Sequence, residues 1–266
     1  MQTAVVTGAG RGMGRAIAER LAAHGLSVLA TDVDAAAAQE TASKLGSGAW
    51  SAALDVRDPG ACRAVAGEAA AKAPLTVWVN NAGILRTEHA WEHPDADVAL
   101  MVDVNLRGVI NGSRAAIGAM AGPGRILNMA SLSAFGPVQG LAIYTSTKWA
   151  VLGFSLSLEG DMRDAGRPIE IRTYCPDVVD TTMVHDIANR PEAAIEFSGS
   201  RWLSVDEAAD AAVDLLYGKR LFAATPRGRM WLASVGRVAP RVGMALLPLI
   251  KKAGERNRRK WQAGDW

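Results

Sequence analysis

The chain has 266 residues, of which 49% are hydrophobic and 21% are charged, and its formal net charge is +2. This composition supplies a sizeable core and excludes a disordered chain, while the length suits one α/β domain. The near-neutral total hides a division of charge along the chain. Residues 218–266 carry 12 basic and 2 acidic residues, whereas residues 1–217 carry 17 basic and 25 acidic ones. An acidic body therefore precedes a basic tail.

The cysteines and the apolar runs indicate the cellular compartment of the protein. Cys62 and Cys175 lie far apart and belong to no Cys-x-x-Cys or Cys/His pattern, so we expect neither a disulfide framework nor a metal site. A strand-like run begins at Thr3, which leaves no room for a signal peptide. The longest apolar stretch, residues 243–250, is too short to span a bilayer. We expect a cytoplasmic protein, and attachment to a membrane surface stays open.

Short β-rich runs alternate with longer helical patterns along the chain. Strands are predicted at Thr3–Val6, Ser27–Thr31, Ala49–Leu54, Leu75–Asn80, Arg125–Ala130, Ile169–Cys175 and Arg220–Ala224. Helices are predicted at Met13–His24, Ala35–Leu45, Pro59–Lys72, Asp95–Ala119, Ile143–Arg163 and Val205–Tyr217. This alternation predicts an α/β fold of the doubly wound Rossmann type, a parallel sheet of about seven strands with helices on both faces.

One segment interrupts the alternation. Residues 183–202 are polar and mixed, contain Pro191 and Gly199, and lie between the sixth strand and the last of these helices. Such a segment is typical of a mobile lid over a site. We expect a catalytic domain over residues 1–224 that includes this lid, followed by an extension over residues 225–266.

A glycine-rich turn follows the first strand. The run Thr7-Gly-Ala-Gly-Arg-Gly-Met-Gly14 leads directly into a helix, where glycines let the backbone approach a pyrophosphate and the helix N-terminus supplies donors. Asp32 ends the second strand, near the distance at which such folds place an acidic residue on the ribose hydroxyls. Asp32, with Asp34 nearby, would repel a 2′-phosphate and favours NAD, whereas Arg11 could pair with that phosphate and favours NADP. We expect NAD.

Further motifs follow in order along the chain. Tyr144-Thr-Ser-Thr-Lys148 places a phenol and an ammonium on one helix face, after Asn128-Met-Ala-Ser131. Asn80-Asn-Ala-Gly83 and Asn105-Leu-Arg-Gly108 lie upstream. Together with the glycine-rich turn, these motifs resemble those of the short-chain dehydrogenase/reductase family, single-domain type, from Thr3 to about Tyr217.

The resemblance implies an NAD(P)-dependent oxidoreductase and assigns its catalytic residues. Tyr144 would be the acid/base, Lys148 its activator and Ser131 the group that orients the substrate, while Asn105 would hold a water linking Lys148 to solvent. A free phenol with a pKa of about 10 is a poor base at neutral pH, and nearby positive charge stabilises the phenolate. Ser133 is a rival to Ser131, but its spacing to Tyr144 is two residues short of the family pattern.

The resemblance also implies the cofactor contacts. These are Gly8, Arg11, Gly12, Met13, Gly14, Asp32, Val33, Asp55, Val56, Asn81, Ala82, Gly83, Tyr144, Lys148, Pro176, Val179 and Thr181. Asp55 and Val56 would flank the adenine, and Val179 and Thr181 would hold the carboxamide. The family usually has Pro-Gly-x-Val-x-Thr where this chain has Pro176-Asp-Val-Val-Asp-Thr181, so Asp177 marks either an altered turn or a charge near the nicotinamide.

Substrate specificity is expected from the loop after Ser131 and from the lid. Apolar residues dominate both stretches: Phe135, Val138, Leu141, Ile143, Met183, Val184, Ile187 and Trp202. His185, Arg190 and Arg201 are available at the rim. This balance favours a secondary alcohol or ketone on a hydrophobic skeleton. The alternative is a catalytically silent protein of the same fold that binds NAD as a sensor.

The tail departs from the family's commonest ending, a glycine-rich stretch that packs a tetramer. From Pro226 to Lys260, apolar residues recur at intervals of three and four with Arg and Lys between them, which predicts two amphipathic helices broken by Pro240. The pattern fits an interfacial membrane anchor, a helical lid or dimer element, or a basic patch for nucleic acid. The acidic body argues against nucleic acid. We expect a homodimer or homotetramer, with membrane-surface contact through residues 226–260 as a further prediction.

Overall fold

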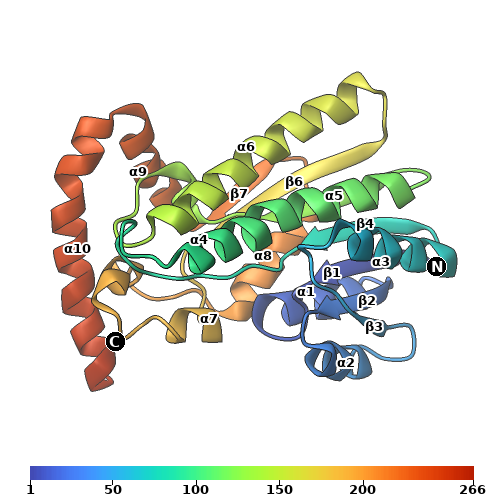
Figure 1. The fold of residues 1–266 in the computed structure, drawn as a ribbon, viewed down its shortest axis with the longest axis horizontal. Coiled ribbons are helices and arrows are strands. Elements are labelled where there is room, and N and C mark those ends of the chain that lie inside the picture. Colours follow the sequence, from blue (N-terminus) through green and yellow to red (C-terminus); the bar gives the residue numbers. More distant parts are fainter.

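The computed structural model describes residues 1–266, whose centre is a seven-stranded parallel sheet with helices on both faces (Figure 1). The strands are β1 (Thr3–Thr7), β2 (Ser27–Asp32), β3 (Trp50–Ala53), β4 (Leu75–Asn80), β5 (Gly124–Met129), β6 (Ile169–Pro176) and β7 (Phe222–Thr225). They lie in the order β3-β2-β1-β4-β5-β6-β7, and every neighbouring pair is parallel. The predicted doubly wound α/β fold of the Rossmann type is confirmed.

Ten α-helices accompany these strands. They are α1 (Gly12–Ala23), α2 (Ala35–Lys44), α3 (Pro59–Lys72), α4 (Asp95–Val102), α5 (Gly108–Ala119), α6 (Ala142–Asp164), α7 (Thr182–His185), α8 (Val205–Tyr217), α9 (Arg227–Val238) and α10 (Pro240–Ala263). Several begin at side-chain caps: Asp58 accepts hydrogen bonds at the start of α3, and Ser204 with Glu207 forms a capping box on α8. These local signals explain why α3 and α8 begin where the sequence predicts.

The strands are buried on both sides because helices cover both faces of the sheet. On β1, Ala4 and Val6 enter a core that also contains residues of α1 and α8. Val5 points to the other face and enters a core that contains residues of α3 and α5. The two-residue period of a strand therefore divides one apolar run between two cores.

The helix predicted at Asp95–Ala119 contains an irregularity. A π turn over Asp103–Arg107 lies between α4 and α5, and the three segments follow one another without a break. The turn contains Asn105, one of the predicted catalytic residues. Such π turns are frequent at functional sites, and periodicity in the sequence does not reveal them.

The tail lies against the body of the molecule. Helix α9 contacts β7 and the short 3₁₀ helix Leu132–Phe135, and α10 contacts the 3₁₀ helix Pro191–Phe197 (Figure 1). The two tail helices meet at Pro240, where the sequence predicts a break. None of the helices combines the length and the apolar character that crossing a bilayer requires.

The predicted lid, residues 183–202, packs on the tail. Phe197 and Trp202 are buried in it, and their rings pack on aromatic side chains of the tail. The ring centroids of Phe197 and Trp261 are 5.5 Å apart, and those of Trp202 and Trp266 are 5.3 Å apart. Trp202 was expected at the substrate site, but its ring packs on the tail instead, a contact that a single stretch of sequence does not show. The mobility of the lid stays a prediction.

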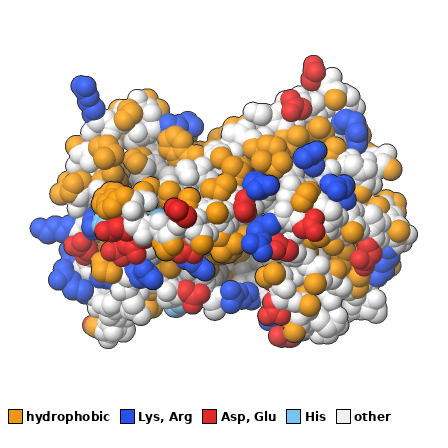
Figure 2. Space-filling model, viewed as in Figure 1, with side chains coloured by type: hydrophobic (Ala, Val, Ile, Leu, Met, Phe, Trp, Pro, Cys, Tyr) orange, Lys and Arg blue, Asp and Glu red, His pale blue; other side chains and the backbone are white.

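Tail side chains also form much of the exposed apolar surface. Seven large hydrophobic residues of the tail are exposed: Trp231, Leu232, Val235, Val238, Val242, Met244 and Leu249. In Figure 2 hydrophobic side chains gather on the part of the molecule formed by the tail helices, with Lys and Arg side chains around them. The predicted amphipathic pattern thus leaves an apolar face uncovered in this chain.

Candidate active site

One cavity of about 820 Å³ runs along the carboxyl ends of the strands. At one end it is lined by the glycine-rich turn after β1 and by the ends of β2 and β4, and at the other end by the lid and the tail. Strand order reverses between β1 and β4, the position where open α/β sheets bind their ligands. All seventeen predicted cofactor contacts line this cavity, as do Ser131, Tyr144 and Lys148.

The glycine-rich turn leaves the N-terminus of α1 open to the cavity. Gly8 has a φ of +64°, and a Cβ on Gly14 would collide with the Gly8 carbonyl oxygen, so the two backbone segments pack directly on each other. No side chain caps α1, because the residue at its N-cap, Arg11, makes no side-chain hydrogen bond there. The free N–H groups and the helix dipole suit a pyrophosphate. This cradle fits the dinucleotide that the sequence predicts.

Asp32 lies beside this turn, at the end of β2. Its carboxylate accepts hydrogen bonds from the backbone N–H groups of Gly10 at 2.9 Å and Asp34 at 3.1 Å. These bonds hold the carboxylate at the cavity wall, and its remaining lone pairs can accept from the two hydroxyls of a ribose. Arg11 is exposed at the same end of the cavity. The geometry brings both predicted determinants of cofactor choice together.

Asn81 connects β4 to the glycine-rich turn. Its side-chain amide donates to the carbonyl oxygens of Thr7 and Gly8, each at 3.0 Å, and its backbone N–H donates to the Thr7 hydroxyl. These bonds join two loops that would otherwise be independent. Asn81 therefore shapes the nucleotide end of the cavity through the backbone of its neighbours.

Tyr144 and Lys148 stand on one face of α6, as their spacing predicts. The Lys148 ammonium is buried, donates to the carbonyl oxygen of Met129 at 3.0 Å, and lies 5.5 Å from the centroid of the Tyr144 ring. Burial lowers the pKa of Lys148 to about 8. Burial also raises the pKa of Tyr144, and the charge of Glu196 adds to that rise, while the Ser131 hydroxyl opposes it. The phenol therefore keeps its proton at neutral pH in the free protein.

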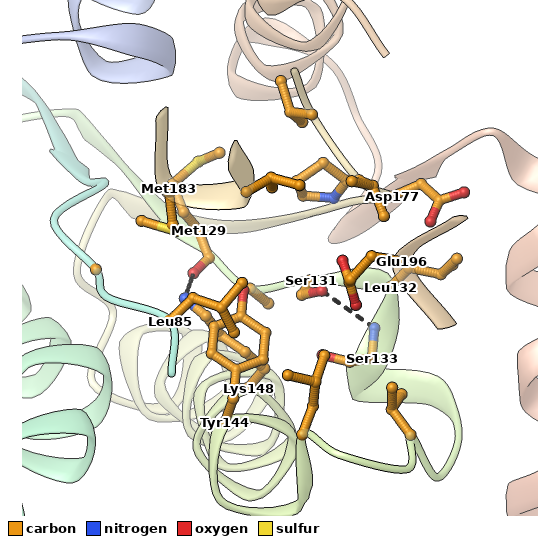
Figure 3. A pocket seen from close by; sticks show the side chains of 18 of the residues that line it. Leu85, Met129, Ser131, Leu132, Ser133, Tyr144, Lys148, Asp177, Met183 and Glu196 are labelled. Carbon is orange, nitrogen blue, oxygen red and sulfur yellow. Dashed lines mark hydrogen bonds between the residues drawn. The ribbon is translucent and has the colours of Figure 1, made fainter. Parts of the chain in front are cut away.

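Ser131 lies next to this pair, at the start of the 3₁₀ helix Leu132–Phe135. Its hydroxyl oxygen accepts a hydrogen bond from the backbone N–H of Ser133 at 3.2 Å. Figure 3 shows Ser131, Tyr144 and Lys148 around the same space. Its rival Ser133 also lines the cavity, and the Ser133 hydroxyl is buried without a hydrogen-bond partner. The two serines thus occupy adjacent positions at one wall.

Asn105 is the one predicted catalytic residue that does not line the cavity. It is fully buried in the π turn, where its side chain accepts from the Ile84 N–H at 2.8 Å and donates to the Ile84 carbonyl at 2.9 Å. A Cβ on Gly83 would touch both the Asn105 amide oxygen and the Lys148 ammonium. Asn105 therefore fixes the segment after β4 close to Lys148, and its amide is occupied by that segment.

The substrate end of the cavity differs from the prediction in its composition. Four predicted apolar residues line it: Val138, Leu141, Met183 and Val184. Phe135, Ile143, Ile187 and Trp202 do not. The three predicted rim residues also lie outside it, because His185 pairs with Asp180, Arg190 with Glu88 and Arg201 with Glu207. Six tail residues supply much of the apolar wall: Leu232, Val235, Leu246, Leu247, Leu249 and Ile250.

A charged cluster at this end was missed at the sequence level. An Arg229 nitrogen lies 2.8 Å from an Asp177 carboxylate oxygen, and a second Arg229 nitrogen donates to the Ser198 hydroxyl at 2.7 Å. Glu196 is the third charged member, and burial together with the charge of Asp177 raises the pKa of Glu196 to about 7. The one signal in the sequence was Asp177 at a position where the family has glycine. Arg229 and Glu196 belong to distant segments, so no local spacing connects them with Asp177.

Known proteins that resemble this chain are named as dehydrogenases or oxidoreductases. A family model described as "short chain dehydrogenase" matches residues 2–192. "Probable oxidoreductase EphD" of Mycobacterium tuberculosis is 35% identical over 186 residues, which are 67% of this chain and 31% of that protein. This chain thus spans about 31% of the length of the EphD relatives it matches. The 1-deoxy-11-beta-hydroxypentalenate dehydrogenase of Streptomyces avermitilis is 32% identical over 229 residues, or 83% of each chain.

Solved structures resemble the whole fold. A short-chain dehydrogenase/reductase from Burkholderia phymatum in complex with NAD superposes with a TM-score of 0.82 at 25% identity, over 91% of this chain and 94% of that one. A gluconate 5-dehydrogenase from Burkholderia cenocepacia, in complex with NADP and tartrate, gives a TM-score of 0.75 at 26% identity, over 86% and 95% of the two chains. These two similar structures therefore hold either form of the nicotinamide cofactor.

Proposed function

Since the chain belongs to the short-chain dehydrogenase/reductase family, an NAD(P)-dependent group of oxidoreductases, we propose that it interconverts a secondary alcohol and a ketone on a hydrophobic small molecule. The observation that carries this proposal is the convergence of Ser131, Tyr144 and Lys148 on the cavity that also contains the open N-terminus of α1. A dinucleotide on that helix would lie in the same cavity as the phenol.

In this proposal the residues at the cavity wall have separate roles in proton transfer and in orienting the substrate. A bound nicotinamide supplies or takes up the hydride. Tyr144 holds or removes the proton at the substrate oxygen, and Ser131 donates a hydrogen bond that orients this oxygen and opposes its developing negative charge. The Lys148 ammonium favours the phenolate form of Tyr144 through its charge. Asn105 acts through position, because it fixes the backbone beside Lys148.

The preferred cofactor in this proposal is NAD. Asp32 presents a carboxylate at the position where a 2′-phosphate of NADP would add negative charge, and two like charges at hydrogen-bond distance repel strongly. Arg11 is exposed and is the competing determinant. The test compares initial rates with NAD and NADP for the wild type and Asp32→Ala. NAD is expected to lose its advantage in the variant, and a wild type that prefers NADP would contradict the assignment.

The substrate class follows from the apolar wall that the tail supplies. Six tail residues line the substrate end, and they would bury a hydrophobic skeleton. The direct test is a panel of secondary alcohols and ketones assayed with NAD or NADH. Oxidation of an apolar secondary alcohol is the expected result. Tight NAD binding without turnover of any member would instead favour the silent NAD sensor, an alternative that no residue at the site supports.

The proposal also assigns the exposed face of the tail to an anionic membrane surface. Leu232, Val235 and Leu249 line the cavity and are also 56%, 36% and 66% exposed, so the substrate end opens toward the exposed apolar face. Exposed basic side chains accompany this face, Arg237 and Arg241 among them. Pairing of two such faces in a symmetric dimer would bring like charges together, whereas anionic lipid complements them. A lipophilic substrate could then enter from the membrane surface.

A further inference from the structure

At the substrate end of the cavity, polar side chains gather at one corner, where Ser133 and Glu196 lie beside Asp177 (Figure 3) and its partner Arg229. We propose that this corner is a subsite for a second hydroxyl group of the substrate. The preferred substrate would then be a diol or a hydroxyketone on a hydrophobic skeleton, with one oxygen at Tyr144 and another at Glu196 and Ser133. This inference rests on the proposed function and adds the polar group by which the substrate is recognised.

Ser133 provides the first observation. Its side chain is 8% exposed, it lines the cavity, and its hydroxyl has no hydrogen-bond partner in the protein. Leaving such a buried hydroxyl unpaired is unfavourable, so a partner from a ligand is favoured. The backbone holds the residue in place, since the Ser133 N–H donates to Ser131 and its carbonyl accepts from the Trp149 indole. The hydroxyl is therefore preorganised at the wall.

Glu196 provides the second, independent observation. Its carboxylate makes no hydrogen bond and no ion pair, although Arg229 lies in the same cluster. Arg229 is engaged elsewhere, by the Asp177 carboxylate at 2.8 Å and the Ser198 hydroxyl at 2.7 Å. The Glu196 backbone is fixed by the Trp202 indole, which donates to its carbonyl oxygen at 3.1 Å. The Glu196 side chain lines the cavity, so its carboxylate can accept a hydrogen bond from a ligand there.

The two groups together select one kind of ligand group. Glu196 as a carboxylate accepts hydrogen bonds, and the Ser133 hydroxyl can donate one. A substrate hydroxyl satisfies both, because it donates to Glu196 and accepts from Ser133. An ether or a second ketone could only accept, so neither satisfies Glu196 in its ionised form. In Figure 3 Glu196, Ser131 and Tyr144 lie around one space, so the second hydroxyl would be close to the reacting carbon.

A matched set of small substrates tests the subsite. Cyclohexanol, trans-1,2-cyclohexanediol and trans-2-aminocyclohexanol share one skeleton and differ in the second group. The wild type is expected to prefer the diol over cyclohexanol by about ten- to hundred-fold in kcat/KM, the size that a hydrogen bond to a charged group supplies. Glu196→Leu should abolish the preference, and Glu196→Gln and Ser133→Ala should each reduce it. Glu192→Gln, on the same 3₁₀ helix but outside the cavity, should leave it unchanged.

A binding measurement separates failure of the subsite from failure of the proposed function. Ligand-observed NMR with the wild type and NADH should show tighter binding of the diol than of cyclohexanol, with the difference lost in Glu196→Leu. That result would support the subsite even if no substrate turned over, in which case the proposed reaction fails and the subsite stands. Equal binding and equal kcat/KM for diol and cyclohexanol would overturn the inference. Preference for the amino alcohol would overturn it too, because the corner would then bind a cation.

Discussion

A buried ammonium is placed beside a buried phenol in this molecule. Lys148 has a single hydrogen bond, to the Met129 carbonyl, and its pKa is lowered to about 8 because it is withdrawn from water. The protein thus bears a cost in folding free energy for a cation that is proposed to activate the neighbouring Tyr144. Replacing a functional residue by an inert one often raises the stability of the protein.

Replacing this ammonium is therefore expected to stabilise the fold. The pKa of Lys148 falls from 10.5 to about 8. Below pH 8 the charged side chain is disfavoured in the folded state by about 3 kcal/mol, and this penalty disappears as the pH rises toward 10.5. Lys148→Met should raise the free energy of unfolding at pH 7, and the gain should narrow between pH 8 and pH 10.5. Urea titrations at several pH values measure it. A loss of stability at pH 7 would show that the ammonium is better paired than its surroundings indicate.

Glu196 should have the opposite pH dependence. Its pKa is raised from 4.5 to about 7, so the folded state disfavours the ionised carboxyl above pH 7, and below pH 4.5 the group is protonated in both states. Glu196→Gln should therefore stabilise the protein above pH 7 and leave its stability below pH 4.5 unchanged. Thermal unfolding across this range, with Glu192→Gln as the matched control, checks the sign. A Tm difference independent of pH would contradict it.

Among single residues, those that lie a few positions apart in the sequence could be assigned to the site most readily. Tyr144 and Lys148 are one helical turn apart, so their shared face follows from the period of a helix. Glu196 and Arg229 are brought to Asp177 by packing of the lid and the tail, which no periodicity encodes. The unpaired hydroxyl of Ser133 is likewise a property of packing.

Among the elements, α9 is attached to the body by an ion pair in addition to its packing on β7 and on the 3₁₀ helix Leu132–Phe135. Arg229 connects α9 to the end of β6 through Asp177 and to the lid through Ser198. Because the Asp177 side chain is only 10% exposed, loss of its partner would leave a nearly buried charge uncompensated.

Arg229→Gln should accordingly loosen α9. Hydrogen exchange of the α9 backbone amides is expected to accelerate, while Arg227→Gln, an exposed change on the same helix, should have no effect. A double-mutant cycle with Asp177→Asn should give a coupling of about 1–3 kcal/mol in the free energy of unfolding. Strictly additive effects of the two substitutions would rule out this ion pair as the attachment of α9.

The elements of the sheet could be predicted because hydrophobic period and caps determine them locally. Strands β1, β2 and β4 and helices α1, α3 and α8 lie within a residue or two of their predicted bounds. The π turn around Asn105 was not predicted: the sequence pattern indicated one continuous helix from Asp95 to Ala119, which the structure divides. The tail was predicted as two helices meeting at Pro240, but their position over the cavity depends on the Phe197, Trp202, Trp261 and Trp266 contacts.

At the scale of the whole molecule, the division of charge matches a division of roles. The acidic body forms six of the seven strands and the end of the cavity proposed for the nucleotide, which the free backbone N–H groups at the start of α1 line together with Arg11. The basic tail closes the substrate end and presents an exposed apolar face. An anionic membrane surface would attract the basic tail and repel the acidic body, so the body would face away from the membrane.

This arrangement predicts charge-dependent membrane binding. The double variant Arg237→Glu/Arg241→Glu should reduce co-sedimentation with phosphatidylserine vesicles by roughly ten-fold or more, because each basic residue contributes about 1 kcal/mol near such a surface. Arg63→Glu/Arg114→Glu, an equal charge change at exposed body positions, should bind nearly like the wild type. Absence of vesicle binding by the wild type, or self-association through the tail, would refute the membrane assignment.

Tyr144 is proposed to perform the proton transfer of an alcohol–ketone oxidoreduction. This role is tested by NAD-dependent turnover of Tyr144→Phe on the best alcohol of the panel, with NAD affinity measured in parallel. The variant removes one hydroxyl, so cofactor affinity should stay near that of the wild type. Turnover is predicted to fall by at least about a hundred-fold, the contribution expected of a positioned acid/base. Turnover near the wild-type value would contradict this role of Tyr144.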